Sequence, residues 1–177
     1  MDKNIIKIIE KLKLQIKIIQ IQLAILLLKQ KLTIPNLDTP KKIILHHGGG
    51  WLDFNGVNEY HRQKWGFKSS LGYYAGYTYF IERTGKIFQA RRDNEEGAHT
   101  RGQNKMSIGI CLMGNFEETL PTKEQLKSLE ELLIKKQKEY NIPKNQIFGH
   151  QNFTATLCPG KNLYSWFLKY KNEISKE

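Results

Sequence analysis

Three side chains that could bind a metal ion are spread widely over this chain. His46 ends an apolar run, His150 follows the apolar segment 147–149, and Cys158 precedes a Pro-Gly pair. Zinc hydrolases commonly use three protein ligands and leave the fourth position to water. One thiolate and two neutral imidazoles would leave the ion with a net charge of about +1, which can acidify a water and polarise a carbonyl. The residue types therefore indicate a hydrolytic zinc site, although the spacing alone also fits a surface histidine and a buried thiol.

The first ligand has two candidates, because His46 and His47 are adjacent. Successive side chains of a strand point to opposite faces, so only one of the two can face a metal that the other ligands also reach. The spacing does not choose between them.

The pattern of apolar and turn residues after position 41 predicts alternating strands and helices. The predicted strands are Lys42–His47, Tyr77–Glu82, Lys86–Ala90, Ser107–Met113 and Ile147–Gly149, the second and third forming a hairpin at Thr84 and Gly85. The predicted helices are Gly56–Trp65, a helix opened by a capping box of Thr122 and Gln125 and running to Tyr140, and Lys161–Lys171. This order predicts an α/β fold with a mixed central β-sheet flanked by helices.

Residues 1–33 differ from the rest of the chain because they contain neither glycine nor proline and are rich in Ile, Leu, Lys and Gln. Apolar residues recur there at alternating steps of three and four, as in the seam of a coiled coil. The pattern predicts a basic amphipathic helix, although the alternation from Leu12 to Ile18 also fits a strand. Residues 34–41 are interpreted as a linker and residues 42–177 as the catalytic domain. The seam positions are Ile5, Ile9, Leu12, Ile16, Ile19, Leu23 and Leu26.

Three roles are open for this predicted helix: self-association, docking on its own domain, and binding to an anionic membrane surface. The apolar run from Ile18 to Leu28 is too short to span a bilayer, which needs about 20 residues. It also lacks a small-residue cleavage site, which argues against a cleaved signal peptide.

The net charge of +11 and the pI near 9.6 predict attraction to polyanions, among them nucleic acid, anionic lipid and bacterial cell wall. We expect no specific nucleic-acid binding, because no block of Lys and Arg is interleaved with aromatic residues. A metal-dependent nuclease is disfavoured as well, since phosphate chemistry calls for carboxylate or asparagine ligands rather than a thiolate. The 177 residues suffice for one globular domain, and two cysteines cannot form a disulfide framework.

Four motifs occur in order along the chain: IILHHGGG, GYTYFIERTGKIFQ, AHTRGQNKMSIGICLMGNF and FGHQNFTATLCPG. Together they resemble the type 2 N-acetylmuramoyl-L-alanine amidases, the family that includes amidase-type phage lysozymes and peptidoglycan recognition proteins. The resemblance covers residues 42–170 and leaves the N-terminal helix outside. It implies the fold of that family, one Zn²⁺ per chain, and His46, His150 and Cys158 as its ligands, which selects His46 over His47.

The resemblance also implies roles for residues outside the ligand set. Tyr77 matches a tyrosine whose hydroxyl lies near the metal-bound water. Thr156 matches a position that is lysine in some phage enzymes and threonine in active recognition proteins, and either group can donate a hydrogen bond to the oxyanion of the reaction. The remaining matches are positions near the substrate groove, where an arginine could pair with a carboxylate of the stem peptide. These three residues are His61, His99 and Arg101.

Two departures from the family pattern are visible. Cys111 stands where some members carry a glutamate regarded as the general base, a feature shared with phage enzymes that leaves the proton acceptor unassigned. Glycines occupy positions 48–50, where small polar residues are usual, and this could widen the wall of the groove.

The function implied by the resemblance is hydrolysis of the amide bond between N-acetylmuramic acid and L-alanine in peptidoglycan, as in a phage endolysin or another cell-wall lytic enzyme. The alternative is a peptidoglycan-binding module of the same fold that does not cut. Either would be made in a bacterial cytoplasm and act at the cell wall or in the periplasm, by an export route that the sequence does not reveal.

Overall fold

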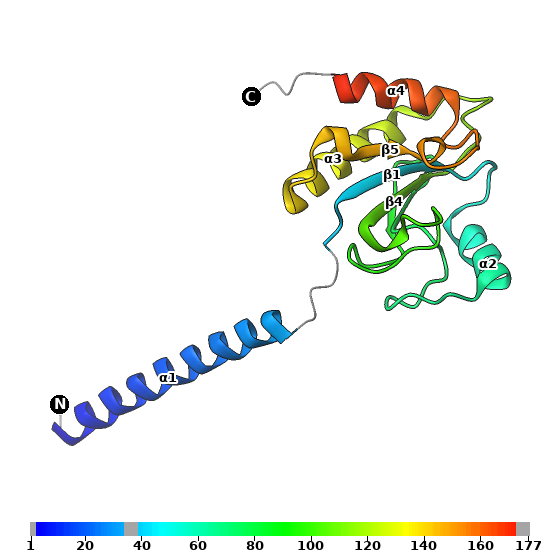
Figure 1. Ribbon diagram of the computed structural model, residues 1–177. Helices are drawn as coiled ribbons and strands as arrows, with labels where there is room; N and C mark the ends of the chain where they lie inside the picture. The colour runs from blue at the N-terminus through cyan, green and yellow to red at the C-terminus, as the bar shows by residue number, and fades with distance from the viewer. Residues whose placement is uncertain (1–2, 34–38, 173–177) are drawn as a thin grey trace. The chain divides into compact units, whose positions relative to one another are not determined.

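The computed structural model describes residues 3–33 and 39–172, so residues 34–38 of the predicted linker lie outside the described part. The chain divides into two compact units, Met1–Leu37 and Asp38–Glu177. The first contains the helix α1, and the second contains the β-sheet and the remaining helices (Figure 1).

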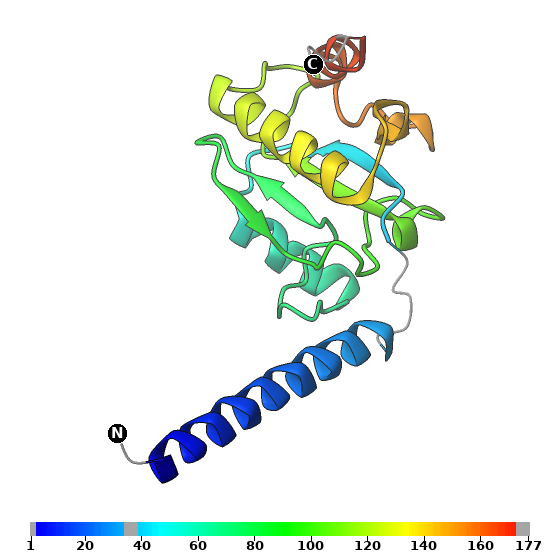
Figure 2. The same cartoon turned by 90° about the vertical axis from the view of Figure 1, so that its left-hand side faces the viewer.

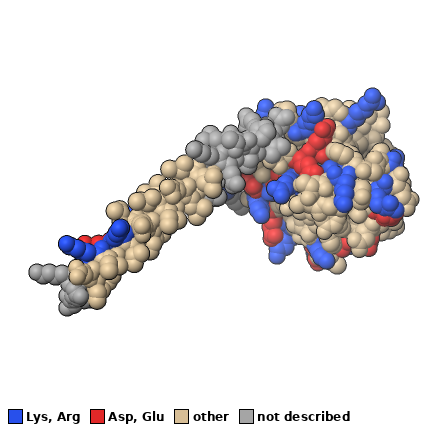
Figure 3. Space-filling model, turned by 90° about the horizontal axis from the view of Figure 1, so that it is seen from below, with Lys and Arg blue, Asp and Glu red and all other residues tan. Residues whose placement is uncertain are grey.

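The helix α1 spans Lys3–Thr33, which confirms a helix rather than the alternative strand. All of its described side chains are exposed, including every position of the predicted seam. Leu14 and Ile21 are also exposed, and at about 100° per residue they lie on the side opposite the seam. The helix is therefore less amphipathic than the sequence pattern suggested. Figure 3 shows its basic side chains gathered near the N-terminal end. Among the described helices, none is long and apolar enough to cross a membrane.

The predicted mixed sheet is confirmed in the second unit, with strand order β3-β2-β4-β1-β5. The central strand β4 (Ser107–Leu112) pairs in parallel with β1 (Lys42–His47) and with β2 (Tyr79–Ile81). The edge strand β5 (Ile147–Gly149) runs parallel to β1, whereas β3 (Ile87–Gln89) is antiparallel to β2. Because β1, β4 and β5 run parallel, the residues that follow β1 and β5 emerge at the same edge of the sheet.

Helices cover both faces of the sheet (Figure 2). On one face α3 (Lys123–Tyr140) and α4 (Lys161–Asn172) bury apolar residues such as Leu129 and Phe167 against β1 and β4. On the other face α2 (Phe54–Trp65) buries Phe54 and Val57 in a smaller cluster. Three short 3-10 helices complete the unit: η1 (Asn104–Met106), η2 (Lys144–Gln146) and η3 (His150–Asn152).

Local hydrogen bonds explain where the helices begin and end. Helix α2 begins at Phe54 rather than at Gly56, because the Asp53 carboxylate accepts the Gly56 N–H at 2.8 Å and so caps the helix two residues earlier. It ends at Trp65 and is capped by Gly66, whose φ of 61° is left-handed. The predicted capping box of Thr122 and Gln125 is confirmed at the start of α3.

The hairpin strands are shorter than predicted, since their ladder pairs only three residues on each side. The turn between them contains Gly85, whose φ is 82°. Beyond the ladder, the backbone of Thr78 donates its N–H to Gly109 and accepts the N–H of Ala90, so the chain stays bound to the sheet without extending the regular pairing.

A buried arginine ties together the loops beside α2. The Arg91 guanidinium is fully buried and donates to the backbone carbonyls of Phe67, Ala75 and Glu96 at 2.6, 2.8 and 3.2 Å. The same group lies 4.4 Å from the centre of the Phe67 ring. The buried Ala75 carbonyl needs a hydrogen-bond donor, and the same guanidinium also binds the two part-buried carbonyls, so one side chain links three segments.

Candidate metal centre and active site

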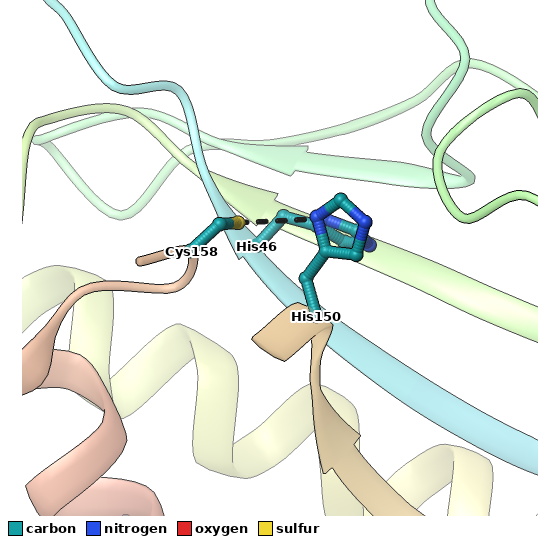
Figure 4. A group of neighbouring side chains, drawn as sticks. All are labelled: His46, His150 and Cys158. Carbon is teal, nitrogen blue, oxygen red and sulfur yellow. Dashed lines mark hydrogen bonds between the residues drawn. The ribbon is translucent and has the colours of Figure 1, made fainter. Parts of the chain in front are cut away.

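His46, His150 and Cys158 converge at the edge of the sheet where β1 and β5 end (Figure 4). His46 is the second-last residue of β1, and His150 directly follows β5, whose Gly149 pairs with Leu45. Cys158 comes from the loop before α4. One nitrogen or sulfur atom of each residue lies within 4.8 Å of the others.

The spacing and the chemistry of these atoms fit a zinc ion. Cys158 Sγ lies 3.6 Å from His46 Nδ1. Tetrahedral zinc with bonds of about 2.3 Å to sulfur and about 2.0 Å to nitrogen would hold such a pair about 3.5 Å apart. Burial, followed by the nearby His99, His150 and His47, lowers the pKa of His46 well below its usual value, so its ring is neutral and one nitrogen keeps a free lone pair.

The Cys158 sulfur is held in a buried position that disfavours its charge. Burial raises the pKa of the thiol to about 12, although a hydrogen bond from the His47 backbone N–H, at 3.4 Å, acts in the opposite direction. A thiolate at this position needs a neighbouring cation, which a bound metal would supply.

The structure separates the two adjacent histidines. His46 is buried and directs Nδ1 towards Cys158. His47 directs its ring towards Phe116: its Nδ1 accepts the backbone N–H of Phe116 at 3.2 Å, and the centres of the His47 and Phe116 rings are 6.2 Å apart. Of this pair, only His46 belongs to the cluster of ligand atoms.

Tyr77 lies beside the cluster, with its ring centre 5.2 Å from that of His46. Burial, followed by the proximity of Cys111 and Cys158, raises the pKa of its hydroxyl well above the usual value. Tyr77 therefore keeps its proton and can act as a hydrogen-bond donor. Thr156 is half-buried, and its Oγ1 accepts the backbone N–H of Cys158 at 3.3 Å.

The three predicted groove residues have different surroundings. His61 is buried in α2, where burial lowers its pKa to about 4 and Nδ1 accepts the Gly76 N–H at 2.8 Å. His99 directs Nδ1 towards Nε2 of His46, at 3.1 Å. Arg101 is exposed on the loop that follows His99.

A groove of about 860 Å³ opens beside the cluster. Tyr77, His99, Arg101 and His150 contribute to its lining, so four of the predicted site residues share one open cavity. Trp65 and Asn104 also line it and were not predicted. Asn104 Oδ1 accepts the backbone N–H groups of His99 and Thr100, at 3.0 and 2.8 Å, and lies within one of the quoted motifs, whereas no local signal marks Trp65.

Cys111 lies opposite His46 in the register of β4 with β1 and is fully buried. Burial and the nearby Cys158 raise the pKa of its thiol well above the usual value. At this position the chain therefore carries a neutral thiol rather than a carboxylate.

Several known proteins are similar to this chain in sequence and in fold. The sequence model of the N-acetylmuramoyl-L-alanine amidase family matches residues 36–161. Peptidoglycan-recognition protein SD of Drosophila melanogaster is 32% identical over 137 residues, which cover 75% of this chain and 74% of that protein.

Two solved structures share the fold. The endolysin N-acetylmuramoyl-L-alanine amidase LysCS from Clostridium intestinale URNW superimposes with a TM-score of 0.67 at 28% identity, over 78% of this chain and 87% of that one. The ectodomain complex of peptidoglycan recognition proteins LCa and LCx with bound tracheal cytotoxin gives a TM-score of 0.65 at 26% identity, over 74% and 82%. The matched motifs, the relatives and the fold show that this chain belongs to the type 2 N-acetylmuramoyl-L-alanine amidase family, which also contains the peptidoglycan recognition proteins.

Proposed function

We propose that this protein is a zinc-dependent hydrolase that cuts the amide bond between N-acetylmuramic acid and L-alanine in bacterial peptidoglycan. The observation that carries this proposal is the convergence of one thiol and two imidazoles within 4.8 Å of one another, with His150 lining an open groove. The amidase activity named for the similar Clostridium intestinale endolysin supports it.

His46, His150 and Cys158 would hold one zinc ion per chain. A zinc ion bound by three protein groups supplies Lewis acidity, which activates water and polarises a carbonyl. The remaining contributions come from the side chains around the groove.

Tyr77 and Thr156 are the proposed donors to the oxyanion that forms when water attacks the amide carbonyl. Tyr77 keeps its proton because burial raises its pKa. Thr156 Oγ1 already accepts a hydrogen bond from the Cys158 N–H, so its own hydrogen stays available for donation. Donors aimed at developing negative charge stabilise the transition state more than the ground state.

The groove is the proposed binding site for the muropeptide. Arg101 is exposed on its wall and can pair with a carboxylate of the stem peptide. His99 shares the lining, and His61 lies behind Tyr77 with its ring centre 5.5 Å from the tyrosine ring. The tracheal cytotoxin bound to recognition proteins LCa and LCx supports a muropeptide as ligand of this fold.

The second candidate is a peptidoglycan-binding module that does not cut, because several relatives are named as recognition proteins. Two measurements on purified cell wall separate the candidates: release of new amino groups, and sedimentation of the protein with the insoluble wall. A hydrolase releases amino groups, and a chelator abolishes the release. A binding module sediments with the wall and releases none.

Residues 42–177 would carry this activity. They would act at the cell wall or in the periplasm after synthesis in a bacterial cytoplasm, as in a phage endolysin or a lytic enzyme of the host.

The exposed apolar residues of α1 need a partner, because such a surface is costly to leave in water. A second copy of the chain, joined through the seam, is the first candidate partner. An anionic membrane surface is the second candidate partner, favoured by the lysines near the N-terminal end of α1.

A further inference from the structure

The two ring nitrogens of His46 face different partners. Nδ1 points towards Cys158, while Nε2 lies 3.1 Å from Nδ1 of His99 and 3.4 Å from Oγ1 of Thr100. Only a nitrogen without a proton can bind a metal, so the hydrogen bond at Nε2 decides whether Nδ1 is free.

The contacts continue beyond His99. Its Nε2 lies 3.4 Å from Oγ of Ser107, and this hydroxyl donates to the backbone carbonyl of Gln103 at 2.6 Å. A serine hydroxyl has one hydrogen, which Ser107 uses for Gln103. Towards His99 the buried Ser107 oxygen can therefore only accept, so Nε2 of His99 carries the proton and Nδ1 of His99 is the acceptor.

We propose that this chain of hydrogen bonds, anchored at the Gln103 carbonyl, fixes the proton of His46 on Nε2 and thereby presents Nδ1 to the metal. His99 is then a positioning residue for a ligand and not only a part of the groove wall. The identity of the metal rests on the proposed function, whereas the position of the proton does not.

If the hydrogen bond between the two histidines ran the other way, from His99 to His46, one nitrogen of each ring would face an unsuitable partner. If Nδ1 of His99 donated to His46, the His46 proton would move to Nδ1, which faces Cys158. Nε2 of His99 would then face an oxygen whose only hydrogen is already bound to Gln103. Buried acceptors left without a donor are costly, so the first direction is favoured. Thr100 is compatible with it, because its hydroxyl can accept from His46 and donate to His99.

The His99 ring is seated in a slot that the backbone keeps open. A Cβ atom at Gly97 or at Gly109 would lie 2.6 Å from Cδ2 of His99, so neither position has room for a side chain. This tight fit holds the ring where its Nδ1 meets Nε2 of His46.

The test uses two variants of full-length protein. His99→Asn keeps an acceptor in the place of Nδ1, because both atoms are bonded to Cγ, whereas His99→Leu has a similar size and no acceptor. The position of the His46 proton is read by ¹⁵N NMR of histidine-labelled, metal-free protein. Zinc affinity is measured separately by competition with a chelator.

We expect His46 of the parent protein to carry its proton on Nε2, and His99→Leu to populate both tautomers. Zinc affinity should fall about 10- to 100-fold in His99→Leu, the usual effect of losing a hydrogen bond to a ligand, and much less in His99→Asn. A parent His46 protonated on Nδ1 would overturn the proposal, whether or not the variants fold. So would a folded His99→Leu with parental zinc affinity, even if its activity fell, because that result assigns His99 to substrate binding alone. A parent protein that binds no zinc would instead refute the proposed function.

Discussion

Cys158 Sγ lies 3.6 Å from Nδ1 of His46, although 112 positions separate the two residues in the sequence. The contact is possible because β1 and β5 are parallel neighbours and the loop that follows β5 returns to the end of β1. The backbone N–H of His47 holds the same sulfur from the strand side. The sheet and the loop after β5 therefore bring the two side chains to the separation that tetrahedral zinc requires.

Replacing Cys158 with Ser should remove both zinc and activity, because a serine hydroxyl is a poor zinc ligand at neutral pH. Elemental analysis should find about one zinc per chain in the parent protein and a small fraction of that in Cys158→Ser. Full zinc occupancy in a folded Cys158→Ser variant would show that the cluster is not the metal site.

His47→Ala is the matched control for the ligand set. Its ring accepts the Phe116 N–H and belongs to no described ligand cluster, so zinc should remain bound. The lost hydrogen bond should cost about 1 kcal/mol of unfolding free energy. If His47→Ala folded but lost its metal, the assignment of His46 as the ligand from this pair would be wrong.

Replacing Tyr77 with Phe should lower the rate of cleavage about 100-fold or more, the usual effect of losing one oxyanion donor, with fold and zinc content unchanged. Tyr74→Phe is the control, since this neighbouring tyrosine does not contribute to the described groove lining. The measurement is the rate at which the parent protein and the two variants cleave a soluble muropeptide. A Tyr77→Phe rate close to that of the parent would assign Tyr77 to packing alone.

Replacing Arg91 with Met should destabilise the second unit by about 3 kcal/mol, because one buried and two part-buried backbone carbonyls would lose their donor. Arg92→Met is the control, because Arg92 is exposed and such changes usually stay within about 0.5 kcal/mol. Urea unfolding measures the unfolding free energy of both variants. Equal stability of the two variants would mean that water replaces the guanidinium.

A protein that starts at Pro35 should fold, bind zinc and cleave soluble muropeptides, because Asp38–Glu177 forms its own compact unit. Self-association or membrane attachment should be lost with α1, as light scattering and vesicle sedimentation would report. An insoluble or metal-free product would show that α1 belongs to the catalytic core. A full-length protein that is monomeric and ignores anionic vesicles would refute both external roles.

The sequence predicted the strands and helices because their signals are local, whereas the ligand set follows from the family resemblance and stays a prediction. Thr122 and Gln125 form the expected capping box, and apolar runs mark β1, β4 and β5. The predicted start of α2, Gly56, is two residues too late. The pattern of apolar residues does not show that the Asp53 side chain caps the helix and so lets it begin at Phe54.

Other features depend on tertiary contacts, which spacing does not encode. Nothing in the sequence around Arg91 indicates that its guanidinium binds carbonyls of three segments. The spacing of His46 and His99 does not reveal that their rings meet either. That contact depends on the space beside Gly97 and Gly109, which only the folded chain brings next to the His99 ring. The seam pattern likewise does not include Leu14 and Ile21, which helix geometry places on the opposite side.

The most direct test of the proposed function is mass spectrometry of the products that the zinc-loaded protein forms from purified peptidoglycan, with Cys158→Ser as the inactive control. We predict free stem peptides that begin with an unmodified L-alanine, together with glycan strands whose muramic acid regains its carboxyl group, and neither product from Cys158→Ser. Cleavage between sugars or within the stem peptide, or an unchanged substrate after incubation with zinc-loaded protein, would contradict the proposal.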